Sequence, residues 1–134
     1  MKTLLMKHPL RLFTILMAVV LLGTACKKDK DKKSGFPRDV TIEYKVSSNS
    51  GLNTADITFT NESGGLTDVD NASLPFSRTI TKTLNNAQAV GLNGSKSIPG
   101  HLKLEIIVDG KSVVAQDFTQ SPVISAIVQH TFYE

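Results

Sequence analysis

The chain has no tryptophan and only one cysteine, Cys26, among its 134 residues. A lone thiol cannot form an intramolecular disulfide, and a zinc site built from several cysteines is excluded for the same reason. The cysteine pair and tryptophan that mark antibody domains are therefore missing. Aromatic residues make up 6% of the sequence, so the core must be mainly aliphatic. The phenylalanines expected to join it are Phe59, Phe76, Phe118 and Phe132.

The N-terminal segment has the layout of an export signal. Its basic residues, with no acidic residue before the cysteine, are Lys2, Lys7 and Arg11. The apolar stretch at 12–22 is shorter than the roughly 20 residues that a membrane-spanning helix needs. Small residues follow directly before Cys26, which resembles a bacterial lipobox, although Gly23 stands where that motif usually has leucine. We predict a lipoprotein signal peptide at 1–25 and lipidation of Cys26. The alternatives are an ordinary cleaved signal and an uncleaved anchor.

The charges are divided unevenly between the two parts of the chain. Residues 26–33 carry five lysines and two aspartates, whereas residues 39–134 carry six basic and ten acidic residues, a net charge of −4. The basic stretch at 26–38 lacks hydrophobic periodicity, and we predict a flexible tether whose lysines face anionic lipid headgroups. The acidic remainder lacks the positive charge that nucleic-acid binding requires, so no such partner is expected.

Alternation of apolar and polar residues dominates the sequence after Pro37. Val40, Ile42, Tyr44 and Val46 fall on one face of an extended segment, which predicts a half-buried strand. Asp109-Gly110 favours a two-residue hairpin turn. The candidate strand segments are 40–46, 55–61, 66–75, 76–84, 88–94, 101–110, 112–118 and 122–134. We therefore predict that 39–134 is an all-β domain, a small immunoglobulin-like β-sandwich of seven or eight antiparallel strands.

Catalytic motifs are scarce in this sequence. His8 belongs to the signal, and His101 and His130 are expected to be surface or strand-edge residues. No G-x-S-x-G motif accompanies the serines, so the chain is predicted not to be an enzyme and to need no cofactor.

A short acidic stretch is the one candidate for a metal site. Asp68, Asp70 and Asn71 cluster oxygen atoms that could bind calcium. The EF-hand pattern fails from this start, because Ala72 and Ser73 stand where a ligand and a glycine are required. The favoured interpretation is a solvated acidic loop that keeps a sheet edge from pairing.

Three segments together resemble the MmpS family, accessory proteins of RND-type MmpL exporters. They are "ADITFTNESGG" at 55–65, "NASLPFSRTIT" at 71–81 and "LEIIVDGK" at 104–111. Phe59 matches an aromatic position of that family, and Phe76 stands for its tryptophan after Leu-Pro. The resemblance implies a small β-sandwich and a partner in membrane transport. The chain departs from the family in having a cysteine in place of a membrane helix and in lacking a cysteine pair in the last strands.

These observations give one expectation and one alternative. The chain is expected to be a non-catalytic, lipid-anchored protein of the cell membrane or outer membrane, facing the periplasm or the cell exterior. It would serve as an accessory binding module, with an RND-type transporter or another envelope protein as partner. Binding is expected to use a strand edge or the loops at one end. The alternative is a surface module that binds glycan or calcium around residues 62–71.

Overall fold

The first strand shows why this sequence folds into sheets. In the computed structural model, which describes residues 35–134, strand β1 (Arg38–Ser47) buries every second side chain. Val40, Ile42, Tyr44 and Val46 are each at most 1% exposed, as the alternation predicts. The predicted signal peptide, Cys26 and most of the predicted tether lie outside the described residues.

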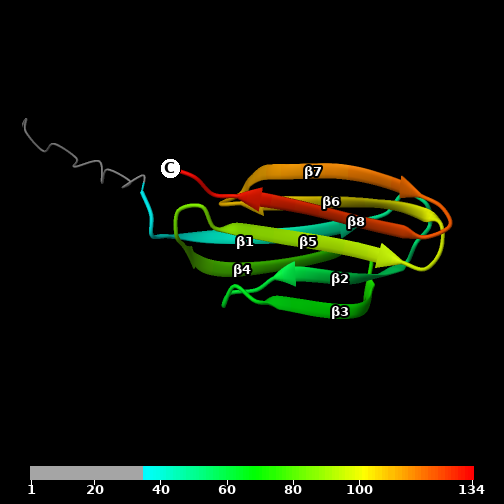
Figure 1. Ribbon diagram of the computed structural model, residues 1–134. Coiled ribbons are helices and arrows are strands. Elements are labelled where there is room, and N and C mark those ends of the chain that lie inside the picture. Colours follow the sequence, from blue (N-terminus) through cyan, green and yellow to red (C-terminus); the bar gives the residue numbers. More distant parts are fainter. Residues whose placement is uncertain (1–34) are drawn as a thin grey trace, which may run out of the picture. The chain divides into compact units, whose positions relative to one another are not determined.

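Eight antiparallel strands form two four-stranded sheets, which confirms the predicted all-β sandwich (Figure 1). The remaining strands are β2 (Thr54–Thr60), β3 (Leu66–Ser73), β4 (Phe76–Leu84), β5 (Ala89–Lys96), β6 (Gly100–Val108), β7 (Lys111–Gln120) and β8 (Ile124–Thr131). One sheet has the order β4-β1-β6-β7 and the other the order β3-β2-β5-β8. Residues 35–134 form one compact unit that contains every described strand pair and the whole described core.

The strand order differs from that of immunoglobulin domains. In those domains the first two strands share a sheet, whereas here β1 and β2 belong to different sheets. The likeness is therefore one of architecture, two packed antiparallel sheets, and does not extend to connectivity. Among the described residues, no helix is both long and apolar enough to cross a membrane.

Aromatic contacts connect the two sheets inside the sandwich. The Tyr44 hydroxyl, from one sheet, donates a buried hydrogen bond of 2.9 Å to the carbonyl oxygen of Thr60 in the other. The Tyr44 ring lies 5.2 Å from the ring of Phe59. Phe59 and Phe132 are buried as expected, whereas Phe76 and Phe118 are only partly buried against the core. The aliphatic side chains of the central strands make up most of the rest.

The hairpin between β6 and β7 turns at the predicted dipeptide. Asp109 and Gly110 have φ angles of 50° and 80°, the left-handed values that a type I′ turn requires. The Asp109 carboxylate also accepts a hydrogen bond of 2.9 Å from the backbone N–H of Thr41. The turn is thereby fastened to the start of β1.

The outer strands define two opposite sides of the sandwich. β3 and β4 form one side, and β7 and β8 form the other (Figure 1). Pro75 lies in the connection from β3 to β4, where the chain crosses between the sheets, as its position after an extended segment predicts.

In β8 the inward register is set by Ile124, which is fully buried, while Val123 is 48% exposed.

Candidate functional site

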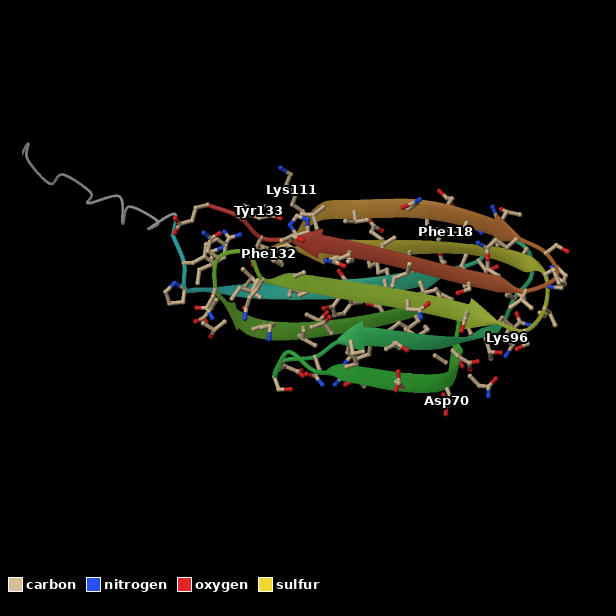
Figure 2. The ribbon with its side chains drawn as sticks, viewed as in Figure 1. Asp70, Lys96, Lys111, Phe118, Phe132 and Tyr133 are labelled. Atoms are coloured by element: carbon tan, nitrogen blue, oxygen red, sulfur yellow. The ribbon has the colours of Figure 1, made fainter. Side chains whose placement is uncertain are left out.

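The candidate calcium ligands lie on an edge strand, with their side chains engaged by other groups. Asp68 accepts a 2.6 Å hydrogen bond from the Thr58 hydroxyl. The Asn71 amide oxygen accepts a 2.8 Å bond from the Lys96 ammonium group. Asp70 points away from the sheets into solvent (Figure 2). A fixed ammonium group beside the amide oxygen repels a second cation, so the three side chains do not converge into a calcium shell.

Residues 66–75 were predicted as a strand, which is confirmed, whereas the interpretation of the acidic residues within them as a solvated loop is wrong. Leu66–Ser73 is strand β3, which pairs with β2. The register shifts between Ala55 and Ile57 because Asp70 and Asn71 of β3 together lie opposite the single residue Asp56, so the bulge is in β3. The Asp56 carboxylate accepts the backbone N–H of Asn71 at 2.8 Å. The charges of this strand do lie on a sheet edge, where they oppose pairing with another chain. Among the described residues, no three His, Cys, Asp or Glu side chains gather as a metal site.

His101 has a serine and an aspartate nearby, but the geometry is not that of a hydrolase. Its Nε2 lies 2.8 Å from Asp117 Oδ1, and its Nδ1 accepts the backbone N–H of Asn49 at 3.2 Å. Because Nδ1 is an acceptor, Nε2 carries the proton and donates it to the carboxylate. The Ser50 hydroxyl accepts the backbone N–H of His101 at 2.8 Å and does not bond the ring. Neither ring nitrogen is placed to activate that serine.

One of the two histidines differs in environment from the expectation. His101 is buried, so its assignment to the surface is wrong. The hydrogen bond from the Asn49 backbone N–H to its ring links the β1–β2 connection to β6. His130 lies in the edge strand β8, as expected, and its ring packs edge-on against Phe132 with centroids 4.7 Å apart. Burial lowers the pKa of His130 below its usual value.

A cleft opens between the edges of the two sheets on the β3–β4 side. Its volume is about 290 Å³, and its walls include Phe59, Val69 and Phe76. The Phe59 and Phe76 rings come from different sheets and lie 6.2 Å apart. Ligand pockets usually measure roughly 300–1,000 Å³, so this cleft fits one or two side chains of a partner.

Charged groups lie at the mouth of the same cleft. Arg78 and Glu62 line it, and both are exposed. Lys82, which is 8% exposed, points inward from β4 and donates a 3.0 Å hydrogen bond from Nζ to the carbonyl oxygen of Glu62. Arg78 is therefore the one cation that lines the cleft, beside the Glu62 carboxylate, while the Lys82 ammonium group is held by the backbone of Glu62. This arrangement fits an apolar side chain accompanied by a carboxylate that can pair with the Arg78 guanidinium.

A second, smaller hollow lies on the outer face of the β3-β2-β5-β8 sheet. It measures about 130 Å³ and is lined by Leu66, Gly91 and Ile127, among others. Gly91 leaves the floor open, and the buried Oδ1 of Asn93 in the same hollow has no hydrogen-bond partner among the described residues. The hollow is too small for a typical ligand but adds apolar surface to this face.

The cleft was not predicted from the sequence, although one signal was present. Phe76, Arg78, Ile80, Lys82 and Leu84 occupy alternate positions and therefore share one face of β4. Two cations on the face that carries the core residues indicate an edge strand with inward charge. What the sequence could not show was that Phe59 lies beside Phe76.

Comparison with models of known protein families gives no match, and comparison with curated proteins gives none either. The residues and their geometry are therefore the basis for assigning a function.

Proposed function

We propose that this chain is a non-catalytic, lipid-anchored protein of the cell envelope whose sandwich serves as an accessory binding module in membrane transport. Its anchor would be acyl chains on Cys26, and its domain would face the periplasm or the cell exterior. The short apolar segment before the cysteine and the basic stretch after it support the anchor. More than one acyl chain is needed for stable anchoring, a condition that bacterial lipoproteins meet.

One observation carries the binding role: the aromatic residues behind the MmpS resemblance meet in one cleft. Phe59 and Phe76 belong to separate segments of that resemblance, and their rings lie 6.2 Å apart beside the cleft mouth. If the matched residues were only core residues, the resemblance would imply a fold shared with that family and nothing about binding. Phe76 is partly buried and lines the open cleft, so a bound partner can reach it.

The charges at the mouth indicate what kind of partner segment fits. Arg78 is exposed and can form a bidentate pair with a carboxylate. An apolar side chain placed against Phe76 would bury apolar surface at roughly 25 cal/mol per Å². We therefore propose an extended segment of an envelope protein that presents an apolar residue next to an acidic one.

Affinity purification from native membranes tests this proposal. Wild-type chain is compared with Arg78→Glu, which reverses the charge at the cleft, and with Lys111→Glu, which reverses a charge on the opposite side of the sandwich. We expect wild type and Lys111→Glu to recover the same membrane protein, and Arg78→Glu to recover at least about tenfold less. Equal recovery by all three variants, or no membrane partner at all, would contradict the proposal.

The anchor is tested separately by mass spectrometry of the mature N-terminus. We expect the purified native chain to begin at Cys26 and to carry acyl chains. A chain that begins at Met1, or one with an unmodified thiol, would overturn the anchor and leave the cleft as an independent question.

A further inference from the structure

Three of the four edge strands carry features that oppose pairing with another strand. β3 has exposed carboxylates at Asp68 and Asp70. β4 has the inward-facing Arg78 and Lys82 described above. β7 begins with Lys111, and its register with β6 shifts between Ile106 and Ile107, which leaves a bulge. Charges and bulges on edge strands are known barriers to edge-to-edge association.

β8 has none of these features. Its sequence, ISAIVQHT, contains no charged residue, glycine or proline. Its pairing with β5 continues without a register shift from Ile124 to Thr131. Ile127, at its middle, is 70% exposed, and Val123 and Tyr133 beside the strand are also large exposed apolar residues. An uncharged, regular edge strand with exposed apolar side chains is a template for strand addition.

Hydrogen bonds at both ends of β8 show which of its residues face β5. The backbone N–H of Ile124 donates to the carbonyl oxygen of Ile98 at 3.2 Å, directly beyond the end of β5. At the other end, the N–H of Phe132 donates to the carbonyl oxygen of Gln88 at 2.9 Å, directly before β5. Even-numbered residues of this strand therefore direct their backbone groups toward β5.

Odd-numbered residues of β8 face the free side, because consecutive residues of a strand direct their backbone groups to opposite sides. Consistent with this, the N–H of Ser125 donates to the side-chain oxygen of Gln120 at 2.8 Å and not to β5. By the same alternation, the backbone groups of Ile127 and Gln129 face outward from the sheet edge. Their side chains are exposed as well.

We propose that β8 pairs with β8 of a second copy of this chain, antiparallel and about a two-fold axis at Ile127. Ile127 then faces Ile127 of the second copy in a hydrogen-bonded pair. Ser125 faces Gln129 of the second copy on each side, and the backbone carbonyl of that Gln129 replaces the Gln120 side chain as the acceptor of the Ser125 N–H. The two β3-β2-β5-β8 sheets join into one continuous sheet. The pairing brings apolar side chains together on the axis and opposes no charges, so the strand is complementary to itself.

A second copy fits this edge because the two-fold pairing sets apolar Ile127 against apolar Ile127 and neutral polar Ser125 against neutral polar Gln129. The interface is small, so the dimer should be weak in solution. On a membrane, anchored chains would have a higher effective concentration. The cleft between β3 and β4 lies on the opposite side and stays open in this dimer. The pairing does not depend on the proposed function.

Cysteine cross-linking tests the register directly. The sandwich, residues 35–134, contains no cysteine, so single cysteines can be introduced into it without background. Hydrogen-bonded antiparallel partners have Cα atoms about 5.5 Å apart. We expect Ile127→Cys to give covalent dimers with a bifunctional thiol reagent too short to span 14 Å. Gln129→Cys should give at least about tenfold fewer, because its two copies would lie about 14 Å apart along the strands.

Sedimentation equilibrium with a matched pair of variants provides the second test. Ile127→Lys places two ammonium groups opposite each other on the axis, whereas Leu66→Lys changes a side chain of similar exposure, 69% against 70%, at the other edge of the same sheet. We expect the first to weaken dimerisation at least about tenfold and the second to leave it unchanged. A wild-type sandwich that stays monomeric at millimolar concentration, equal effects of both lysines, or stronger cross-linking at 129 than at 127 would each overturn the proposal.

Discussion

The Tyr44 hydroxyl is the most informative single atom to remove, because its hydrogen bond joins the two sheets inside the core. Tyr44→Phe deletes the 2.9 Å bond to the Thr60 carbonyl oxygen and leaves the ring contact with Phe59 in place. Losing one partner of a buried hydrogen bond costs about 1–3 kcal/mol. At pH 8 the variant should therefore be less stable than wild type by that amount.

The same hydroxyl makes the stability difference between Tyr44→Phe and wild type change with pH in the alkaline range. Burial, with a smaller contribution from the Glu62 carboxylate, raises the pKa of Tyr44 above its usual value, against the opposing effect of the bond to Thr60. The unfolded chain then loses this proton first, near pH 10. The stabilisation is complete below about pH 10 and falls as pH rises further. Phenylalanine has no such proton, so the difference between variant and wild type should shrink by about 1.4 kcal/mol from pH 8 to pH 11.

Urea unfolding of residues 35–134, followed by circular dichroism at pH 8, 10 and 11, measures both effects. Comparing each variant with wild type at the same pH cancels the titration of the other groups. A difference that stays constant from pH 8 to pH 11 would refute the reasoning, as would a Tyr44→Phe variant as stable as wild type at pH 8.

Three further predictions concern the core, the acidic edge and β8. Gly94→Val should lower the free energy of unfolding by about 1–3 kcal/mol, because a Cβ there would lie 3.2 Å from a leucine methyl of β6. Gly91→Val, in the same strand, should change it by under about 0.5 kcal/mol in the same urea assay. Millimolar calcium should leave the melting temperature unchanged, since the Lys96 ammonium holds Asn71; a clear rise would revive the calcium alternative. Because the pKa of His130 is lowered in the fold, the unfolded chain takes up a proton at this histidine first as pH falls. The free energy of unfolding should therefore decrease below about pH 6.5. His130→Gln should reduce that decrease, which thermal melts at acid pH measure.

Local patterns in the sequence predicted the strands well because they need no distant partner. The burial alternation of β1 follows from side-chain period alone, and the Asp109-Gly110 turn follows from its two positive φ angles. Strand order could not be predicted in this way, because one alternating strand fits beside any other. The placement of β1 between β4 and β6 depends on the packing of the whole domain.

The functional surfaces were harder to predict because they combine residues that are distant in the sequence. The sequence predicted a surface position for His101. In the fold, its ring nitrogens form hydrogen bonds with Asn49 and Asp117, which belong to other segments. The cleft requires Phe59 and Phe76 to meet across two sheets. By contrast, the charge pattern of the edge strands was readable from the sequence once each strand was known to be an edge.

Photo-crosslinking from the cleft in native membranes tests the central claim most directly. Thr67 lines the cleft beside Phe59 and can be replaced by a photoreactive amino acid in the full-length chain. The account predicts a covalent adduct with one envelope protein, and the adduct should be lost when Arg78→Glu is added. Illumination that yields no protein adduct, or only dimers of this chain, would contradict it.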